Sequence, residues 1–201
     1  MTELLRWDAM ALALIGHDVT VLDDADLDRP TPCTGWTVAD LIRHMNERHE
    51  AIIETVLAPL ADPGDDPRDS FARTAGRWVA AMEQTGDIVR LPWLGPMPTE
   101  EVLSIHYVDM LVHRWDLTRA LDRTYWIPER FTARALPIAQ RITAPGSRLN
   151  APGGAYHTPL PQDPALPTID NIVALLGRNP NWQPTTPAMP QPPTTQPTAA
   201  R

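Results

Sequence analysis

Apolar residues recur at the spacing of an α-helix along four long segments of the chain. In each segment they fall three and four positions apart, which places them on one face of a helix that can be buried in a core. The pattern predicts long helices over residues 3–22, 37–57, 70–84 and 99–121. Four helices of this length joined by moderate loops are typical of a bundle, so we expect an all-α fold.

Shorter elements are expected after the fourth long helix. A helix over 129–141 follows Pro128 and contains Pro137, which could kink it, and a last short helix over 168–177 begins at Thr168 as its cap and stops at Gly177. Residues 86–98 are too rich in Gly and Pro for a helix, and a short extended segment is the alternative there.

The composition changes after Trp182. Residues 183–201 contain mainly Pro, Thr and Gln, with almost no charge or large apolar groups, so burial cannot offset the entropy cost of ordering them. We therefore expect one helical domain over 1–182 and a disordered tail over 183–201. A Pro-rich ligand for a partner protein is the alternative interpretation of the tail.

Charge and cysteine content narrow the classes of function. The net charge is −8, with 17 Arg and no Lys, which argues against binding to a nucleic acid backbone. No apolar run is long enough to span a membrane, and the start of the chain lacks the basic region of a secretory signal, so we expect a cytoplasmic protein. The single Cys33 excludes an internal disulfide and a multi-cysteine zinc site, so any metal must be held by His and carboxylates.

Four titratable residues form a stripe on the predicted helix 99–121, within "HYVDMLVHRWDL". At about 100° per residue, His106, Asp109, His113 and Asp116 lie within roughly 80° of arc. Apolar residues flank this arc on both sides, so the stripe should point into the bundle. The residues left for a partly solvated face are Ser104, Tyr107, Leu111 and Arg114.

Buried carboxylates need hydrogen bonds, an opposite charge or a cation. Asp109 and His113 are four residues apart and could bind one metal ion from successive turns, with His44 of the second long helix as the third ligand. Asp116 or His106 could then orient a ligand imidazole. A buried His–Asp network without metal would give the same stripe. His49 is five residues beyond His44, so we expect it to point away, toward the surface.

Three segments together resemble a known family. "PTPCTGWTVADLIRHM" (31–45), "HYVDMLVHRWDLTRA" (106–120) and "LLGRNPNW" (175–182) resemble the DinB-like four-helix proteins of actinobacteria, in particular those related to the N-terminal domain of mycothiol-dependent maleylpyruvate isomerase. The resemblance implies a DinB-like four-helix bundle that binds a divalent ion, typically zinc or nickel. It implies His44, Asp109 and His113 as the metal ligands. The isomerase has Glu where this chain has Asp109, one methylene shorter.

Two classes of function follow from this resemblance. In the first, an enzyme uses its metal to activate a low-molecular-weight thiol such as mycothiol for S-transfer to, or isomerisation of, a small electrophile. His106 would then shuttle a proton. In the second, the protein binds metal without catalysis, in a stress-related role, or activates water as a hydrolase. No basic pocket for an anionic substrate is evident, although Arg43, Arg114 and Arg119 lie near the motifs. A homodimer is one option for its assembly.

Overall fold

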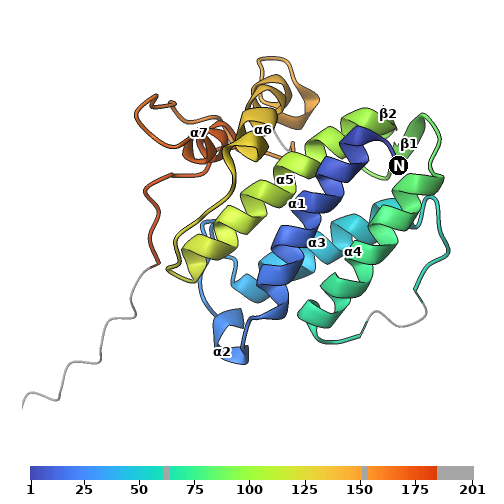
Figure 1. Cartoon of the computed structure of the whole chain (residues 1–201), viewed down its shortest axis with the longest axis horizontal. Helices are drawn as coiled ribbons and strands as arrows, with labels where there is room; N and C mark the ends of the chain where they lie inside the picture. The colour runs from blue at the N-terminus through green and yellow to red at the C-terminus, as the bar shows by residue number, and fades with distance from the viewer. Residues whose placement is uncertain (61–63, 151–153, 185–201) are drawn as a thin grey trace, which may run out of the picture.

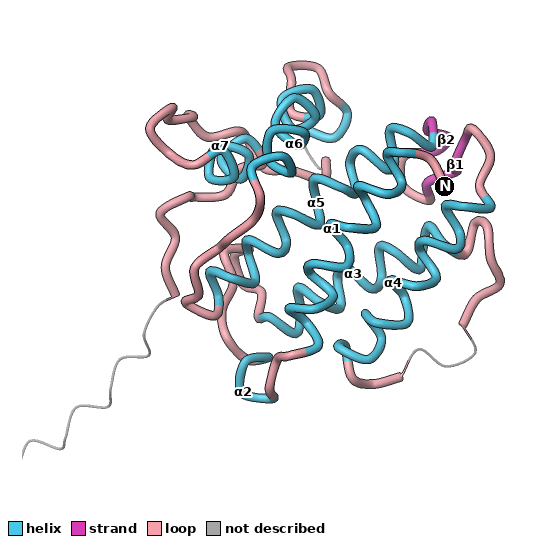
Figure 2. The backbone as a smooth tube through the Cα atoms, viewed as in Figure 1, coloured by secondary structure: helices cyan, strands magenta, loops and turns pink. Residues whose placement is uncertain are grey.

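The computed structural model of the chain describes residues 1–60, 64–150 and 154–184. It confirms an all-α fold with four long helices and short additional helices toward the C-terminal end (Figures 1 and 2). The elements are α1 (Glu3–Thr20), α2 (Asp24–Leu27), α3 (Val38–Ile53), α4 (Pro67–Gln84), β1 (Ile88–Leu91), β2 (Gly95–Pro98), α5 (Thr99–Ala120), α6 (Glu129–Ile142), a 3-10 turn (Arg148–Asn150) and α7 (Thr168–Leu175).

The four long helices are arranged as two packed pairs. Helix α1 lies along α5, α3 lies along α4, and α1 also packs against α4, which joins the pairs (Figure 1). By contrast, α3 and α5 approach each other little. The side chains that these two helices direct toward each other therefore have space between them, and this space becomes the cavity described below.

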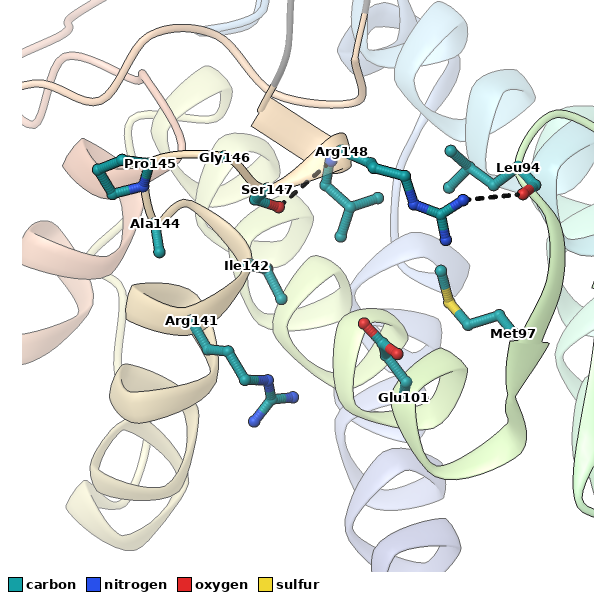
Figure 3. A pocket seen from close by; sticks show the side chains of 11 residues that line it. Leu94, Met97, Glu101, Arg141, Ile142, Ala144, Pro145, Gly146, Ser147 and Arg148 are labelled. Atoms are coloured by element: carbon teal, nitrogen blue, oxygen red, sulfur yellow. Dashed lines mark hydrogen bonds between the residues drawn. The ribbon is translucent and has the colours of Figure 1, made fainter.

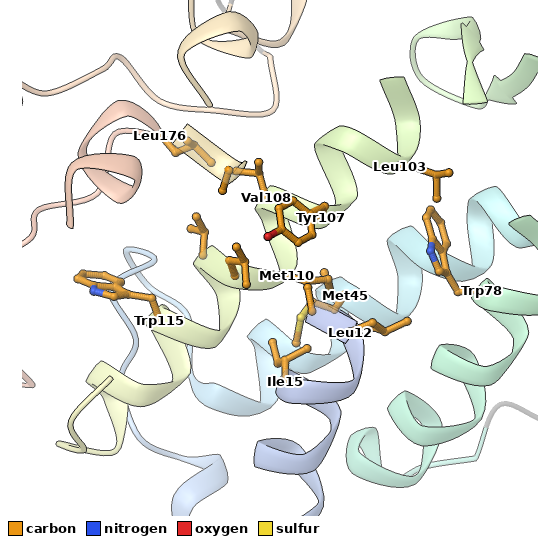
Figure 4. Close-up of a cluster of buried hydrophobic side chains, with 14 of the residues drawn as sticks. Leu12, Ile15, Met45, Trp78, Leu103, Tyr107, Val108, Met110, Trp115 and Leu176 are labelled. Carbon is orange, nitrogen blue, oxygen red and sulfur yellow. The ribbon is translucent and has the colours of Figure 1, made fainter. Parts of the chain in front are cut away.

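Helix α5 is the central element of the fold. Of its 22 residues, 15 are buried, as expected for a helix that is covered on all sides. Figure 4 shows Tyr107, Val108 and Met110 of this helix among side chains from α1 and α3. Tyr107 and Leu111 are fully buried, so their expected place on a partly solvated face is wrong.

The reason for this burial is the position of α6 and α7. These helices pack on each other, and α6 also packs against α5. The Tyr107 hydroxyl donates to the Phe131 carbonyl over 2.9 Å, and Trp115 Nε1 donates to Asp170 Oδ1 over 2.9 Å. The two shorter helices therefore cover the face of α5 that the sequence pattern left for solvent.

Local sequence signals start most of the helices. Thr37 and Asp40 form a capping box, in which each side chain accepts a hydrogen bond from the other residue's backbone N–H. Asp66 caps α4, and Pro67 occupies its first turn. The expected cap of α7 is wrong, because Thr168 is already helical, Pro167 precedes it, and no side chain caps this end.

The remaining differences concern short elements. Helix α2 was not expected, and residues 86–98 form an antiparallel hairpin in which Val89 faces Met97. Pro137 lies inside α6, which continues through it. The disordered tail stays a prediction, because residues 185–201 lie outside the described part of the chain. In the part that is described, no helix combines the length and the apolarity required to cross a bilayer.

Candidate functional site

A cavity of about 1350 Å³ lies between α3 and α5. It is bounded by the loop before α3, by the hairpin, and by the segments before and after α7. Its walls are both polar and aromatic, which is typical of a site for a small molecule. The residues with polar or aromatic side chains that line it include Cys33, Trp36, His44, Arg48, His49, Trp78, Trp93, His106, Asp109, His113, Arg148, Tyr156, His157, Arg178 and Trp182.

All three predicted metal ligands lie on the wall of this cavity. His44 comes from α3, and Asp109 and His113 come from successive turns of α5. The ring centroids of His44 and His113 are 5.8 Å apart. Two imidazoles on one tetrahedral zinc ion, at metal–nitrogen distances of about 2.0–2.1 Å, have centroids roughly 5 Å apart, so the spacing of the two rings suits a shared ion.

His44 is held in its neutral form. Burial lowers its pKa to about 4, and the nearby charges of His113, Arg48 and Arg178 act in the same direction. Its ring packs against Trp36, with centroids 4.7 Å apart. A metal-binding imidazole must be unprotonated, so the environment of His44 suits a ligand.

Asp109 is the carboxylate on the α5 side of the site. Burial raises its pKa, while His113 and a hydrogen bond from Tyr156 act in the opposite direction. The Tyr156 hydroxyl donates to Asp109 Oδ1 over 2.8 Å. No arginine in the described residues forms an ion pair with this carboxylate. A half-buried carboxylate in this situation is stabilised by a bound cation.

His113 is oriented by Asp116, which lies one turn further along α5. Its Nδ1 is 3.2 Å from Asp116 Oδ2, so Nε2 is the nitrogen left for another partner. Although burial raises the pKa of Asp116, the Arg178 guanidinium and His113 hold it below its ordinary value. Arg178 Nε donates to both oxygens, over 2.9 and 3.0 Å. Carboxylate–histidine pairs of this kind commonly fix the ring of a metal ligand.

Arg178 reaches Asp116 because of the way α7 ends. Gly177 has φ +82°, and the backbone N–H groups of Gly177 and Arg178 return to the carbonyls of Ala174 and Val173. This C-terminal cap requires a residue that adopts positive φ without strain, which glycine does. The "LLGRNPNW" segment thus contributes an ion pair to the site.

Cys33 lies beside the same ion pair and is not a nucleophile at neutral pH. Its Sγ is 3.6 Å from Asp116 Oδ2 and 3.9 Å from Arg178. Burial and the Asp116 charge raise the pKa of this thiol to about 12, although Arg178 opposes the change. The thiolate is the reactive form, so this residue stays unreactive.

The side chains proposed as metal ligands do not converge on a single position. Among residues 1–60, 64–150 and 154–184, no group of three or more His, Cys, Asp or Glu side chains has the geometry of a metal site. His44, Asp109 and His113 nevertheless supply two imidazoles and one half-buried carboxylate to the same cavity. This donor set fits zinc or nickel in kind, and the ligand assignment stays a prediction.

His49 is the clearest correction to the predictions made from the sequence. It is 2 % exposed, not on the surface, and its Nε2 lies 2.7 Å from His106 Nε2. His49 is buried although it points away from His44, because α4 packs along that side of α3 and places Phe71 and Trp78 against the His49 ring. No periodicity within α3 alone could have shown this.

His106 contacts neither His113 nor Asp109 through a hydrogen bond. Its Nδ1 is 2.5 Å from Asp8 Oδ1, and its ring is stacked on Trp78 with centroids 3.9 Å apart. It therefore belongs to a separate polar chain made of Asp8, His106 and His49. Asp8 carried no signal in the sequence apart from being an acidic residue among apolar positions of the first helix.

The arginines that lie near the motifs in the sequence are not the arginines that line the cavity. Arg114 and Arg119 are held by Asp18 and Asp170, on other sides of α5. The cavity is instead lined by Arg48, Arg148 and Arg178, of which Arg178 is paired with Asp116. Arg48 lies over the ring of Trp93 at 4.5 Å and forms no ion pair with a carboxylate of the described residues, so its charge can meet an anion.

A smaller hollow of about 430 Å³ adjoins the cavity beside the hairpin. Figure 3 shows Arg148 crossing it toward the Leu94 carbonyl, over 3.5 Å, with Glu101 and Arg141 on the opposite side. Arg148, Leu94 and Met97 also line the large cavity. The hollow and the cavity therefore adjoin each other.

The fold and the site together define a helical bundle with a polar central cavity. The family of the mycothiol maleylpyruvate isomerase N-terminal domain matches residues 11–118, more than half of the chain, so the protein belongs to this family. This confirms the family resemblance, and the match covers the first motif segment and most of the second, whereas residues 175–182 lie outside it.

Individual proteins are also similar to this chain. Two uncharacterized proteins of Mycobacterium tuberculosis, from strains CDC 1551 / Oshkosh and H37Rv, are 27% identical over 157 residues, which cover 76% of this chain and 85% of theirs. Crystal structures of the mycothiol-dependent maleylpyruvate isomerase and of one of its variants match with a TM-score of 0.54 at 19% identity. The structural match covers 70% of this chain and 68% of the isomerase chain, and it shows a shared fold.

Proposed function

We propose that this protein is a divalent-metal-dependent enzyme that activates a low-molecular-weight thiol, of the mycothiol kind, for S-transfer to or isomerisation of a small electrophile. The observation that carries the proposal is that His44 from α3, and Asp109 and His113 from α5, line the same cavity. Membership of the family supports the thiol, because mycothiol dependence is part of the name of the structurally similar isomerase.

The ligands proposed for the ion are His44, Asp109 and His113. A divalent ion at these side chains would supply positive charge that favours the ionised form of a thiol. Asp116, fixed by Arg178, holds the His113 ring so that Nε2 is available on the cavity side. Tyr156 donates to Asp109 Oδ1, and Oδ2 has no hydrogen bond from the described residues.

The cavity supports an enzyme over a closed structural site. A structural ion is enclosed by protein ligands, whereas this donor set borders about 1350 Å³ of space. Arg48 and Arg148 are exposed and line this space, so an electrophile that carries a carboxylate fits its charge. Cys33 keeps its proton and therefore does not compete with a bound thiol.

Metal analysis and calorimetry on the full chain test the proposal. The wild type, His113→Ala and the control His17→Ala, whose residue is exposed on α1, are purified and titrated with mycothiol. We expect one divalent ion per chain in the wild type and the control, its loss in His113→Ala, and thiol binding only where the metal is present.

The other outcomes distinguish the rival functions. Metal without a thiol response would favour a hydrolase that activates water or a non-catalytic metal-binding protein. Absence of metal from all three proteins would mean that the polar stripe on α5 is a hydrogen-bonded network. The thiol mechanism would then be refuted.

A further inference from the structure

A chain of hydrogen bonds joins three helices beside the proposed metal site. Asp8 of α1 contacts His106 of α5 over 2.5 Å, and His106 contacts His49 of α3 over 2.7 Å. Asp8 is fully buried, and its second oxygen accepts a hydrogen bond from Trp78 Nε1 over 2.8 Å. His49 and His106 line the cavity, whereas Asp8 lies behind them. The chain therefore leads from the cavity into the core.

With Asp8 ionised and His106 neutral, these contacts allow one arrangement of the protons. An ionised Asp8 accepts only, so His106 Nδ1 must donate to it. In neutral His106 the other nitrogen, Nε2, is then an acceptor, and the proton between the two rings belongs to His49 Nε2. Burial, with His106, His113 and His44, holds the pKa of His49 well below its ordinary value, so this ring is neutral. Its Nδ1 therefore carries a lone pair, and this buried atom has no hydrogen-bond partner among the described residues.

A proton added at His49 can place its positive charge on His106, beside the Asp8 carboxylate. If a proton binds to His49 Nδ1, the shared proton can pass from His49 Nε2 to His106 Nε2. His49 stays neutral, and the positive charge is carried by His106. There it lies between the Asp8 carboxylate and the face of Trp78, whose ring is 3.9 Å away and inclined by only 23°. A carboxylate and an indole face both stabilise a cation.

We propose that Asp8, His106 and His49 form a proton relay, which takes up at His49 Nδ1 the proton that a cavity ligand loses when its thiol ionises. The S–H bond breaks and sulfur keeps the electron pair. An N–H bond forms at His49 Nδ1, the His49 Nε2–H bond breaks, and an N–H bond forms at His106 Nε2. One thiolate and one imidazolium result, so charge and protons balance. Asp8 and Trp78 are positioning residues.

The relay rests on the proposed function for its substrate, but its proton positions do not. Around the two rings, the titratable groups are Asp8 on α1, His44 on α3, and Asp109 and His113 on α5, while α4 contributes the apolar rings of Phe71 and Trp78. Asp8 is the one carboxylate of this set that bonds to His106, so it determines where the charge resides.

Nitrogen-15 NMR of the histidine side chains tests the relay in metal-free full-length protein, without any thiol. At neutral pH we expect a proton on Nδ1 of His106 and on Nε2 of His49. On acidification, the imidazolium should appear at His106 while His49 changes to the Nδ1–H form. An imidazolium that forms at His49, or a His49 that already carries its proton on Nδ1 at neutral pH, would overturn the proposal.

Asp8→Asn provides a directional control. Its amide oxygen must accept from Trp78 Nε1, so its NH₂ group faces His106 Nδ1 and both tautomers should invert. Unchanged tautomers in the folded variant would contradict the relay. If this variant does not fold, the wild-type spectra still decide the question.

Proton release on thiol binding tests the function of the relay. Metal-loaded wild type, His49→Gln and the exposed control His17→Gln are titrated with mycothiol in buffers of different ionisation enthalpy. Glutamine can donate to His106 but has no basic nitrogen, so His49→Gln should release one more proton per bound thiol than the other two. Equal release would refute the relay. If none of the proteins binds thiol, the proposed function fails, and the NMR result decides the relay separately.

Discussion

The substitution Asp116→Asn should destabilise the protein much more than its small change in size suggests. Asp116 is fully buried, and both of its oxygens accept from Arg178, whose side chain is only 12% exposed. Oδ2 also lies 3.2 Å from His113 Nδ1. The substitution removes the negative charge and leaves the guanidinium buried without a counterion.

The magnitude follows from this burial. Removal of one partner from a buried ion pair costs about 3–5 kcal/mol. The substituted asparagine side chain would still accept one hydrogen bond from Arg178, so we expect a loss near the lower end, about 3 kcal/mol. Arg178→Met should cost a similar amount because it leaves the carboxylate uncompensated. The double variant buries no unpaired charge, so its loss should be smaller than the sum by up to about 3 kcal/mol.

Urea unfolding, followed by tryptophan fluorescence and circular dichroism, measures these free energies in a double-mutant cycle. Arg123→Gln is the control. Arg123 is half exposed and forms a long surface ion pair with Asp26, at 3.9 Å, which is expected to contribute about 0–1 kcal/mol to stability. If the two buried substitutions add within about 0.5 kcal/mol, or if Asp116→Asn costs no more than the control, the ion pair is not coupled and the reasoning is wrong.

Three further predictions concern single residues. Gly177→Ala should lower the free energy of unfolding, measured in urea, by about 1–3 kcal/mol. The reason is that φ at this position is +82° and a new Cβ would lie 2.5 Å from the Cβ of His157. The control Gly76→Ala, in open space on α4, should raise the free energy of unfolding by up to about 1 kcal/mol. Burial lowers the pKa of His44 from 6.5 to about 4, so as the pH falls His44 is protonated in the unfolded chain before it is protonated in the folded one. The unfolding free energy of metal-free protein should therefore fall from pH 7 toward 4, and less steeply in His44→Gln; parallel curves would contradict this. Cys33 should react very slowly with a disulfide reagent at pH 8, since a pKa of about 12 leaves roughly 10⁻⁴ as thiolate, and Asp116→Asn should accelerate the reaction by removing a charge that raises this pKa.

Much of the candidate site was predictable because its proposed ligands follow helical periodicity. Asp109, His113 and Asp116 lie on adjacent turns of α5, so spacing alone places them together, and the Asp116–His113 contact is local. His44 required the family resemblance as well as its position in the second long helix. His44, Asp109 and His113 line one cavity because each helix directs a consistent face inward.

The features that spacing missed depend on contacts between distant segments. Arg178 joins Asp116 across 62 positions and Tyr156 joins Asp109 across 47, and each comes from a segment without periodicity. Asp8 and His106 are 98 positions apart. Sequence spacing gives the face of a helix on which a residue lies, but not the side chain that another element brings against it.

The long helices, the cap that starts α3 and the polar stripe on α5 were all contained in the local sequence. Each of these follows from interactions within a few residues, namely backbone hydrogen bonds, capping groups and apolar periodicity. Which faces of the helices are covered depends instead on how the elements pack in three dimensions. Packing buried Tyr107 beneath α6 and turned His49 from an expected surface residue into a partner of His106, because α4 and α6 lie on faces that local interactions leave undefined.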